Sequence, residues 1–257
     1  MSTRLAAVAS FDRQRSADPV YRSIIALDLE ESTRRTDPVK GELRRVMYDL
    51  LGHALEAVAI TGNRLEQLTD RGDGVLVLVR PHDEVPKTIL LDRLIPLLAT
   101  LLAEYNAQAA RSAVRMRLRV VVHAGEVQVD SRGWYGEAID VAIRLLDAPS
   151  VKKALRQAAA PLVLVISDEI YSGVVWHGYV DAGTYFPVVG VSVANRRHRG
   201  WVHVPAPAAS PVAAGPARDR RPAAAPGSSA LAGERAEYPV AATIRRAAVT
   251  RAGTAAR

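Results

Sequence analysis

Apolar residues along the chain alternate between short continuous runs and longer stretches with helical spacing. Residues 21–29 (YRSIIALDL) form an apolar, β-branched run that ends in acidic and hydroxyl residues, which predicts a buried central strand. A Thr-Asp-Pro sequence at 36–38 suits the start of a helix. Apolar residues then recur at three- and four-residue spacing over 43–58, which predicts a long amphipathic helix.

The next two apolar runs, at 64–69 and 75–79, flank the sequence Asp-Arg-Gly-Asp-Gly at 70–74. Turn-forming residues between apolar runs are typical of a β-hairpin. We therefore expect two paired strands that are joined at this turn.

The same alternation of strands and helices continues to residue 204. Further helices are predicted at 86–110, 136–146 and 168–175, and further strands at 114–122, 161–167, 186–193 and 201–204. Basic and apolar residues alternate in the 114–122 strand, which predicts that one of its faces is exposed to solvent. The order of elements favours an α/β (α+β) fold, a mixed β-sheet with helices mainly on one face.

Composition divides the chain into three parts. Residues 1–17 lack the apolar core of a signal peptide and are expected to be a flexible N-terminus. Residues 18–205 carry the predicted domain. Residues 206–257 are dominated by Ala, Pro, Arg, Gly and Ser, so we expect a disordered basic tail, because too few large apolar side chains offset the ordering entropy.

The charge distribution argues against a nucleic-acid partner. The formal net charge is +7, but from residue 205 onward eight arginines face only three carboxylates, which accounts for five of those charges. The domain is therefore nearly neutral. No stretch of about 20 apolar residues is present to span a membrane. The absence of cysteine excludes disulfides, thiolate metal sites and a cysteine nucleophile, and the chain suits the cytoplasm.

The candidate chemistry begins with two carboxylates, Asp28 at the end of the first strand and Asp73 in the hairpin turn. If that strand lies beside the hairpin, both groups meet at one sheet edge, where oxygen ligands suit hard divalent ions. Taken alone, each aspartate is more often a turn former or a helix cap.

Four segments in order resemble motifs of the class III nucleotidyl cyclase catalytic domain. They are DLEEST at 28–33, GDG at 72–74, RVVVHAGEV at 119–127 and YGEAIDVAIRL at 135–145. The resemblance implies a ferredoxin-like core that works as a head-to-tail homodimer with shared active sites. It also implies a nucleoside triphosphate substrate, whose ribose 3′-hydroxyl attacks the α-phosphate and expels pyrophosphate.

The resemblance also assigns roles to individual residues. Asp28, the carbonyl of Leu29, and Asp73 of one subunit would hold two Mn²⁺ or Mg²⁺ ions, and Arg144 of the other subunit would stabilise charge on the reacting phosphates. Asp140 stands where the family normally has an asparagine that orients the ribose. The phosphate-binding turn would include Ser32 and Thr33, of the DLEEST segment.

The base-reading positions depart from the purine cyclases of this family. Counting without gaps from Asp73 and Asp140 gives Thr69 and Gly133, and neither residue suits adenine or guanine. The pyrimidine cyclases of bacterial Pycsar antiphage defence share the core and depart in the same way. This shared departure favours a uridylate or cytidylate cyclase here, with UTP as the preferred substrate. The cyclic product would activate a separate effector.

Two alternatives stay open, a purine (adenylate) cyclase and a catalytically inactive nucleotide-binding or regulatory domain. Tyr21, at the start of the first strand, either contacts the base or covers the core. We expect a basic loop at 196–199, where the family often places a phosphate-gripping lysine, and we assign His123 no catalytic role.

Overall fold

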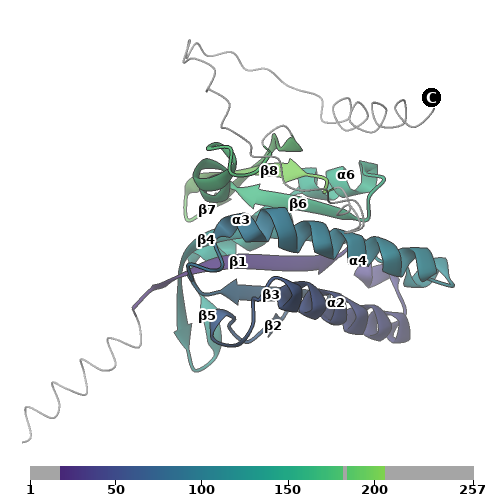
Figure 1. Ribbon diagram of the computed structural model, residues 1–257. Helices are drawn as coiled ribbons and strands as arrows, with labels where there is room; N and C mark the ends of the chain where they lie inside the picture. Colours follow the sequence, from purple (N-terminus) through teal and green to yellow (C-terminus); the bar gives the residue numbers. More distant parts are fainter. Residues whose placement is uncertain (1–17, 182–183, 206–257) are drawn as a thin grey trace, which may run out of the picture. The chain divides into compact units, whose positions relative to one another are not determined.

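The computed structural model describes residues 18–181 and 184–205 (Figure 1). All of them belong to one compact unit. The predicted flexible N-terminus (1–17) and basic tail (206–257) lie outside the described residues. In the described part of the chain, no helix combines the length and the apolar character that crossing a membrane requires.

The centre of the domain is an eight-stranded mixed sheet in the order β2-β3-β1-β4-β6-β8-β7, with β5 paired to β4 beyond this path. The strands are β1 (Val20–Leu29), β2 (Thr69–Asp70), β3 (Gly74–Val79), β4 (Leu118–Asp130), β5 (Gly133–Tyr135), β6 (Leu162–Ser167), β7 (Phe186–Val193) and β8 (Arg196–His203). Among the described strands, only β4 and β6 pair in parallel. The predicted class, an α/β (α+β) fold with a mixed sheet, is therefore confirmed, but its helices cover both faces of the sheet rather than mainly one.

Two longer helices and several short ones surround the sheet. They are α2 (Asp37–Ala57), α3 (Lys87–Ile89), α4 (Ile95–Gln108), α5 (Glu137–Leu146), α6 (Pro149–Gln157) and α7 (Asp168–Ile170), with 3-10 turns η1 (Ser32–Arg34), η2 (Gly62–Arg64) and η4 (Ser112–Val114) and π-helical turns η3 (Leu90–Leu94) and η5 (Tyr171–Val175). The helix predicted at 86–110 is thus one run of α3, η3 and α4.

Side chains alternate between the two faces of the sheet, as strand geometry requires. On one face, Ile25, Leu27 and Val77 join the buried cores of α2 and α4 in a single apolar cluster. Figure 1 shows these two helices lying across that face. The opposite face, which includes Asp28 and Arg119, is covered by α5 and α6.

Helix α5 lies very close to the sheet because glycines face it. A β-carbon built on Gly125 of β4 would stand 2.8 Å from the β-carbon of Ala138 in α5, and one on Gly200 of β8 would stand 2.9 Å from Leu145. Side chains at these two positions would push the helix away, so the glycines fix where α5 lies.

Two predicted strands have different bounds in the structure. The strand predicted at 114–122 begins at Leu118 and continues to Asp130, because the Asn106 side chain bonds both the N–H and the carbonyl of Met116 at 2.8 and 2.7 Å. These bonds occupy the backbone groups that a sheet ladder would need. The prediction that one face of this strand is exposed to solvent is also wrong, since Arg119 in β4 is only 8% exposed.

The first strand of the predicted hairpin is only two residues long. Residue Leu65 forms an isolated bridge with Val79, and the buried Glu66 carboxylate binds Arg22 at 2.9 Å and Arg80 at 2.6 Å. The segment is therefore anchored by these ion pairs together with two backbone hydrogen bonds, from the Glu66 N–H to Leu78 and from the Arg80 N–H to Arg64.

The loop predicted at 196–199 needs correction, and one helix was not predicted. Residues 196–199 are not a loop, because they begin β8, and the hairpin turn consists of Ala194 and Asn195, both with positive φ. That pair of left-handed residues is the geometry of a tight two-residue hairpin turn. Helix α6 was not predicted, because its nine residues contain few apolar side chains.

The close approach at Gly125 yields a stability prediction. We expect Gly125→Ala to lower the free energy of unfolding by about 1–3 kcal/mol, because the new methyl group overpacks against Ala138. Urea unfolding measures this change. The control is Gly41→Ala on the exposed side of α2, where nothing lies within 4 Å and helix propensity predicts up to about 1 kcal/mol of stabilisation. Equal effects of both variants would contradict the packing argument.

Candidate active site

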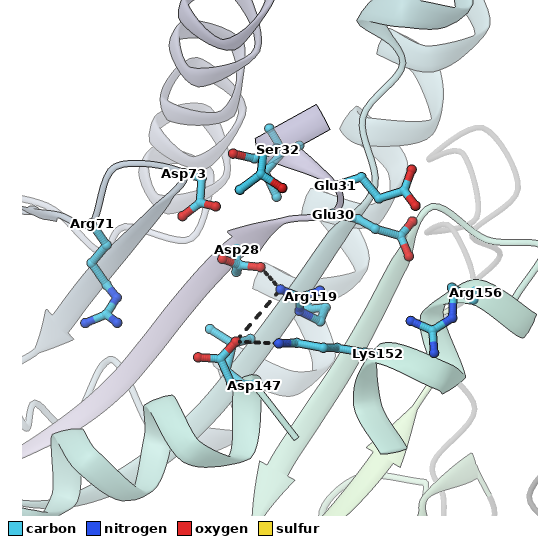
Figure 2. A pocket seen from close by; sticks show the side chains of 13 residues that line it. Asp28, Glu30, Glu31, Ser32, Arg71, Asp73, Arg119, Asp147, Lys152 and Arg156 are labelled. Atoms are coloured by element: carbon cyan, nitrogen blue, oxygen red, sulfur yellow. Dashed lines mark hydrogen bonds and ion pairs between the residues drawn. The ribbon is translucent and has the colours of Figure 1, made fainter. Parts of the chain in front are cut away.

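The two predicted carboxylates do meet at one edge of the sheet. Strand β1 pairs with β3 so that Asp28 lies opposite Gly74, and the N–H of Leu29 donates to the carbonyl of Asp73 at 3.0 Å. This backbone bond extends the ladder by one step beyond β3. The hairpin turn is therefore attached directly to the end of β1, and Asp28 and Asp73 belong to neighbouring positions (Figure 2).

Gly74 makes this attachment possible. A β-carbon at residue 74 would lie 2.3 Å from the backbone oxygen of Leu27, closer than any side chain permits. The turn also includes Gly72, whose φ of +81° favours glycine. The sequence Gly-Asp-Gly therefore places Asp73 between two positions that favour glycine, Gly72 because of its positive φ and Gly74 because it has no room for a side chain.

A side chain from α2 holds the same turn from the other side. The Arg44 guanidinium donates to the Asp70 carboxylate and to the carbonyl of Gly72, each at 2.5 Å. The N–H of Gly72 and the hydroxyl of Tyr48 also donate to Asp70, at 2.9 and 3.3 Å. Arg44 lowers the pKa of the Asp70 carboxyl to about 2, so the carboxylate stays charged at neutral pH. These contacts, which we name the Arg44 clamp, fix the turn that carries Asp73.

On the other side of Asp28, a buried arginine completes a chain of ion pairs. Asp28 lies opposite Arg119 in the pairing of β1 with β4, and the Arg119 guanidinium donates to the Asp28 carboxylate. Arg119 also lies 4.0 Å from Asp147, which binds Lys152 at 3.2 Å. Figure 2 shows this chain running from β1 to α6. Burial lowers the pKa of Arg119, and the Asp147 carboxylate, which favours the charged guanidinium, opposes this shift.

These groups line a pocket of about 440 Å³. Its wall includes the predicted residues Asp28, Leu29, Ser32, Thr33 and Asp73. Ser32 is buried in η1, and Thr33 is exposed. The cationic side chains of the wall are Arg71, Arg119, Lys152 and Arg156. The pocket thus combines carboxylates with cations, a mixture that suits a metal-bound phosphate ligand.

The donor set fits a hard divalent ion. The Asp73 side chain forms no hydrogen bond or ion pair with any described residue, so its oxygens are available to a ligand. Within the described residues no cluster of three or more His, Cys, Asp or Glu side chains is placed to hold a metal. Magnesium is commonly held by one or two carboxylates, with substrate phosphates and water completing its shell, and two aspartates beside the carbonyl of Leu29 match that pattern.

Asp140 and Arg144 do not line this pocket. Both are exposed on α5, one helical turn apart, on the side away from its buried residues. They therefore share a face of the helix. The pocket of a single chain contains the predicted metal ligands but neither of the two predicted catalytic residues.

The predicted base contacts also lie away from Asp28. Tyr21 is seven residues earlier on β1, roughly 23 Å along an extended strand. It packs against the main apolar cluster, with the Lys87 ammonium 5.0 Å from its ring centre. Thr69 is exposed on β2 opposite Leu76, and Gly133 begins β5. None of the three lines the pocket of its own chain.

His123 has a structural environment. The residue is only 3% exposed. Its Nδ1 lies 2.7 Å from the Ser167 hydroxyl and 3.3 Å from the Glu169 carboxylate. The bond to His123 is the main cause that lowers the pKa of Glu169 to about 2. Because all of these partners join β4 to β6 and α7, His123 links elements of the fold.

Sequence reasoning gave no role to several residues of the pocket, namely Arg119, Asp147, Lys152 and Arg156. The place of Arg119 in the pocket could have been predicted, because the pairing of β1 with β4 sets it directly opposite Asp28. The other three depend on α6 and on the end of α5, and the sequence pattern did not reveal α6.

Comparisons with known proteins place the fold. No protein-family model and no curated protein matches the chain. Among solved structures, the guanylyl cyclase Cya2 aligns with a TM-score of 0.54 at 13% identity, covering 77% of this chain and 98% of that one. An adenylate/guanylate cyclase/hydrolase from Silicibacter pomeroyi gives 0.53 at 17%, covering 74% and 99%. The guanylate cyclase domain of RhGC from Catenaria anguillulae, in complex with GTP, gives 0.50 at 14%, covering 74% and 99%. The chain has the fold of these cyclase domains.

The Arg44 clamp predicts an effect on metal binding. We expect Arg44→Ala to weaken binding of Mn²⁺ by about tenfold, because a group that orients a metal ligand commonly contributes that much. Electron paramagnetic resonance of free Mn²⁺ measures the affinity. Arg45→Ala, an exposed neighbour on the same helix, is the charge-matched control. Unchanged affinity in Arg44→Ala, or an equal loss in the control, would exclude the positioning role.

Proposed function

We propose that the protein is a metal-dependent nucleotidyl cyclase that converts a pyrimidine nucleoside triphosphate, UTP in preference to CTP, to its 3′,5′-cyclic monophosphate. The observation that carries the proposal is the meeting of Asp28 and Asp73 at one sheet edge, in a pocket that also contains cations. The cyclase fold and the four sequence motifs support it. The product would be a second messenger for a separate effector, with antiphage defence as the setting that the sequence resemblance suggests.

In this reaction the ribose 3′-oxygen forms a bond to the α-phosphorus, and the bond from that phosphorus to the bridging oxygen breaks. The hydroxyl proton passes to solvent, and pyrophosphate leaves. Asp28, Asp73 and the Leu29 carbonyl would hold two Mn²⁺ or Mg²⁺ ions, which lower the pKa of the hydroxyl and neutralise the leaving group. The chain's own cations add fixed positive charge where negative charge develops. Ser32 and Thr33 line the same pocket and would lie beside the phosphates.

The exposed position of Arg144 supports a dimeric enzyme. Because Asp140 and Arg144 lie outside the pocket of their own chain, a second copy would have to bring them to it. In the proposed head-to-tail homodimer, Arg144 stabilises the phosphates held by the other subunit, and Asp140 accepts a ribose hydroxyl. A carboxylate at residue 140 also adds negative charge near phosphate, which disfavours the charged form of the ligand there.

The choice of a pyrimidine rests on the two base-reading positions. Thr69 offers one short hydroxyl on the edge strand β2, and Gly133 offers no side chain. A purine would need a matched donor and acceptor from these positions. The similar solved structures include a guanylyl cyclase and an adenylate/guanylate cyclase/hydrolase, so a purine triphosphate is the competing substrate.

The direct test supplies Mn²⁺ and one of UTP, CTP, ATP or GTP to the purified chain. We expect cyclic UMP to be the main product, identified by chromatography and mass. Asp73→Asn is expected to reduce the rate at least about a hundredfold, because it removes a metal-holding carboxylate. A cyclic purine would refute the base assignment and keep the mechanism. No cyclic product from any of the four would refute the proposed activity.

Complementation tests the shared active site. Asp73→Asn and Arg144→Ala chains, each inactive alone, are mixed under conditions that exchange subunits. Half of the resulting dimers are mixed, and each contains one intact site, so about a quarter of the wild-type rate should return. Sedimentation confirms that both variants still form dimers. If dimers form and no activity returns, Arg144 does not act across the interface.

A further inference from the structure

Helix α6 presents two cations to the pocket. Lys152 and Arg156 both line it, and they lie one helical turn apart on the same side of α6. The opposite side of the helix is buried through Val151 and Leu155. Lys153, on the same helix, is exposed and does not line the pocket. Figure 2 shows Lys152 and Arg156 on α6 at the same pocket as Asp28 and Arg119.

A second arginine fixes α6 relative to Asp28. The Arg117 guanidinium donates to the carbonyl oxygens of Leu155 and Ala158 at the end of α6, the latter at 3.1 Å. Its Nε also lies 3.2 Å from the Glu30 carboxylate, in the turn that follows β1. The helix is thus tied to the segment that carries the metal-site aspartate, and its cations have a fixed position.

The pocket also contains donors without partners. The Nε of Arg119 is buried without a hydrogen bond, in a residue that is 8% exposed. Arg156 is exposed, and it forms no hydrogen bond or ion pair with any residue that the structure describes. An unpaired buried donor is costly unless a ligand satisfies it, and a guanidinium prefers phosphate or carboxylate.

We propose that Lys152 and Arg156 of α6, together with Arg119, bind the β- and γ-phosphates of the substrate within the same chain that holds the metal ions. This inference rests on the proposed function and adds the residues that grip the terminal phosphates. The Asp147 carboxylate lies 3.2 Å from the Lys152 ammonium and 4.0 Å from the Arg119 guanidinium, so it holds the two cations near each other. The pyrophosphate product then leaves from α6, and the α-phosphate lies nearer to Asp28 and Asp73.

The basic segment at 196–199 suits this task less well. Arg196 at the start of β8 is already paired with the Glu137 carboxylate of α5, and His198 faces the same carboxylate at 3.7 Å. None of the residues 196–199 lines the pocket. Of α6 and the segment 196–199, only α6 therefore brings cations to the pocket of its own chain.

Calorimetric titration of the full chain with magnesium tripolyphosphate, which has no base or ribose, tests this subsite. Lys152→Ala and Arg156→Ala are each expected to weaken binding by about tenfold, as the loss of one charge-assisted hydrogen bond implies. Lys153→Ala removes the same charge from the same helix and should leave the affinity unchanged. Circular dichroism verifies that each variant folds.

Three results would overturn the subsite. They are the absence of tripolyphosphate binding by the wild-type chain, an unchanged affinity in both pocket variants, and an equal loss in Lys153→Ala, which would indicate only nonspecific attraction. Lys152→Arg should retain most of the affinity, because it keeps the charge.

The outcome is separable from that of the proposed function. If the variants lose tripolyphosphate binding and the wild-type chain forms no cyclic nucleotide, the subsite stands and the cyclase activity fails. If cyclic nucleotide forms and neither variant changes the KM for the triphosphate or inhibition by pyrophosphate, the activity stands and the subsite fails.

Discussion

The pairing of β1 between β3 and β4 is the constraint on which the candidate site depends. It sets Asp28 between Gly74 on one side and Arg119 on the other. The first neighbour must lack a side chain, because a β-carbon at residue 74 would collide with the backbone of β1. The second neighbour places a guanidinium against the aspartate. A shift of one residue in the register between β1 and β4 would turn Asp28 and Arg119 to opposite faces of the sheet, and the pocket would lose its central ion pair.

Burial of the ion pair between Asp28 and Arg119 costs free energy on folding. Removing a guanidinium and a carboxylate from water costs several kcal/mol per ion, which mutual attraction only partly offsets. Arg119 also retains a buried Nε without a partner, a defect that typically costs about 1–3 kcal/mol. An apolar pair at the end of two central strands would stabilise the domain at least as well. The presence of these charges at a pocket, where a phosphate ligand would satisfy them, is more readily explained by binding than by stability.

Much of the fold follows from local patterns, and the rest depends on contacts that a pattern does not contain. The apolar run of β1 and the helical spacing of α2 and α5 predicted those elements, and the Gly-Asp-Gly sequence predicted the turn. The start of β4 depends on Asn106, which captures the backbone of Met116 from a different helix. Half of the candidate site was predicted, because its aspartates lie in recognisable motifs. The cations of α6 were missed, because an amphipathic helix of nine residues is too short to be distinct in the sequence.

The exposure of Arg144 has a consequence for how the proposed enzyme would be controlled. A guanidinium in water is screened, and it stabilises developing phosphate charge strongly only where solvent is excluded. The close packing of α5 on Gly125 and Gly200 fixes the side of that helix on which Arg144 is exposed, and Arg144 does not line the pocket of its own chain. In the proposed dimer, the contact that excludes water from Arg144 is the same contact that delivers it to the partner's phosphates. Assembly and catalytic competence are then one event, and any signal that shifts the equilibrium between monomer and dimer also sets the rate.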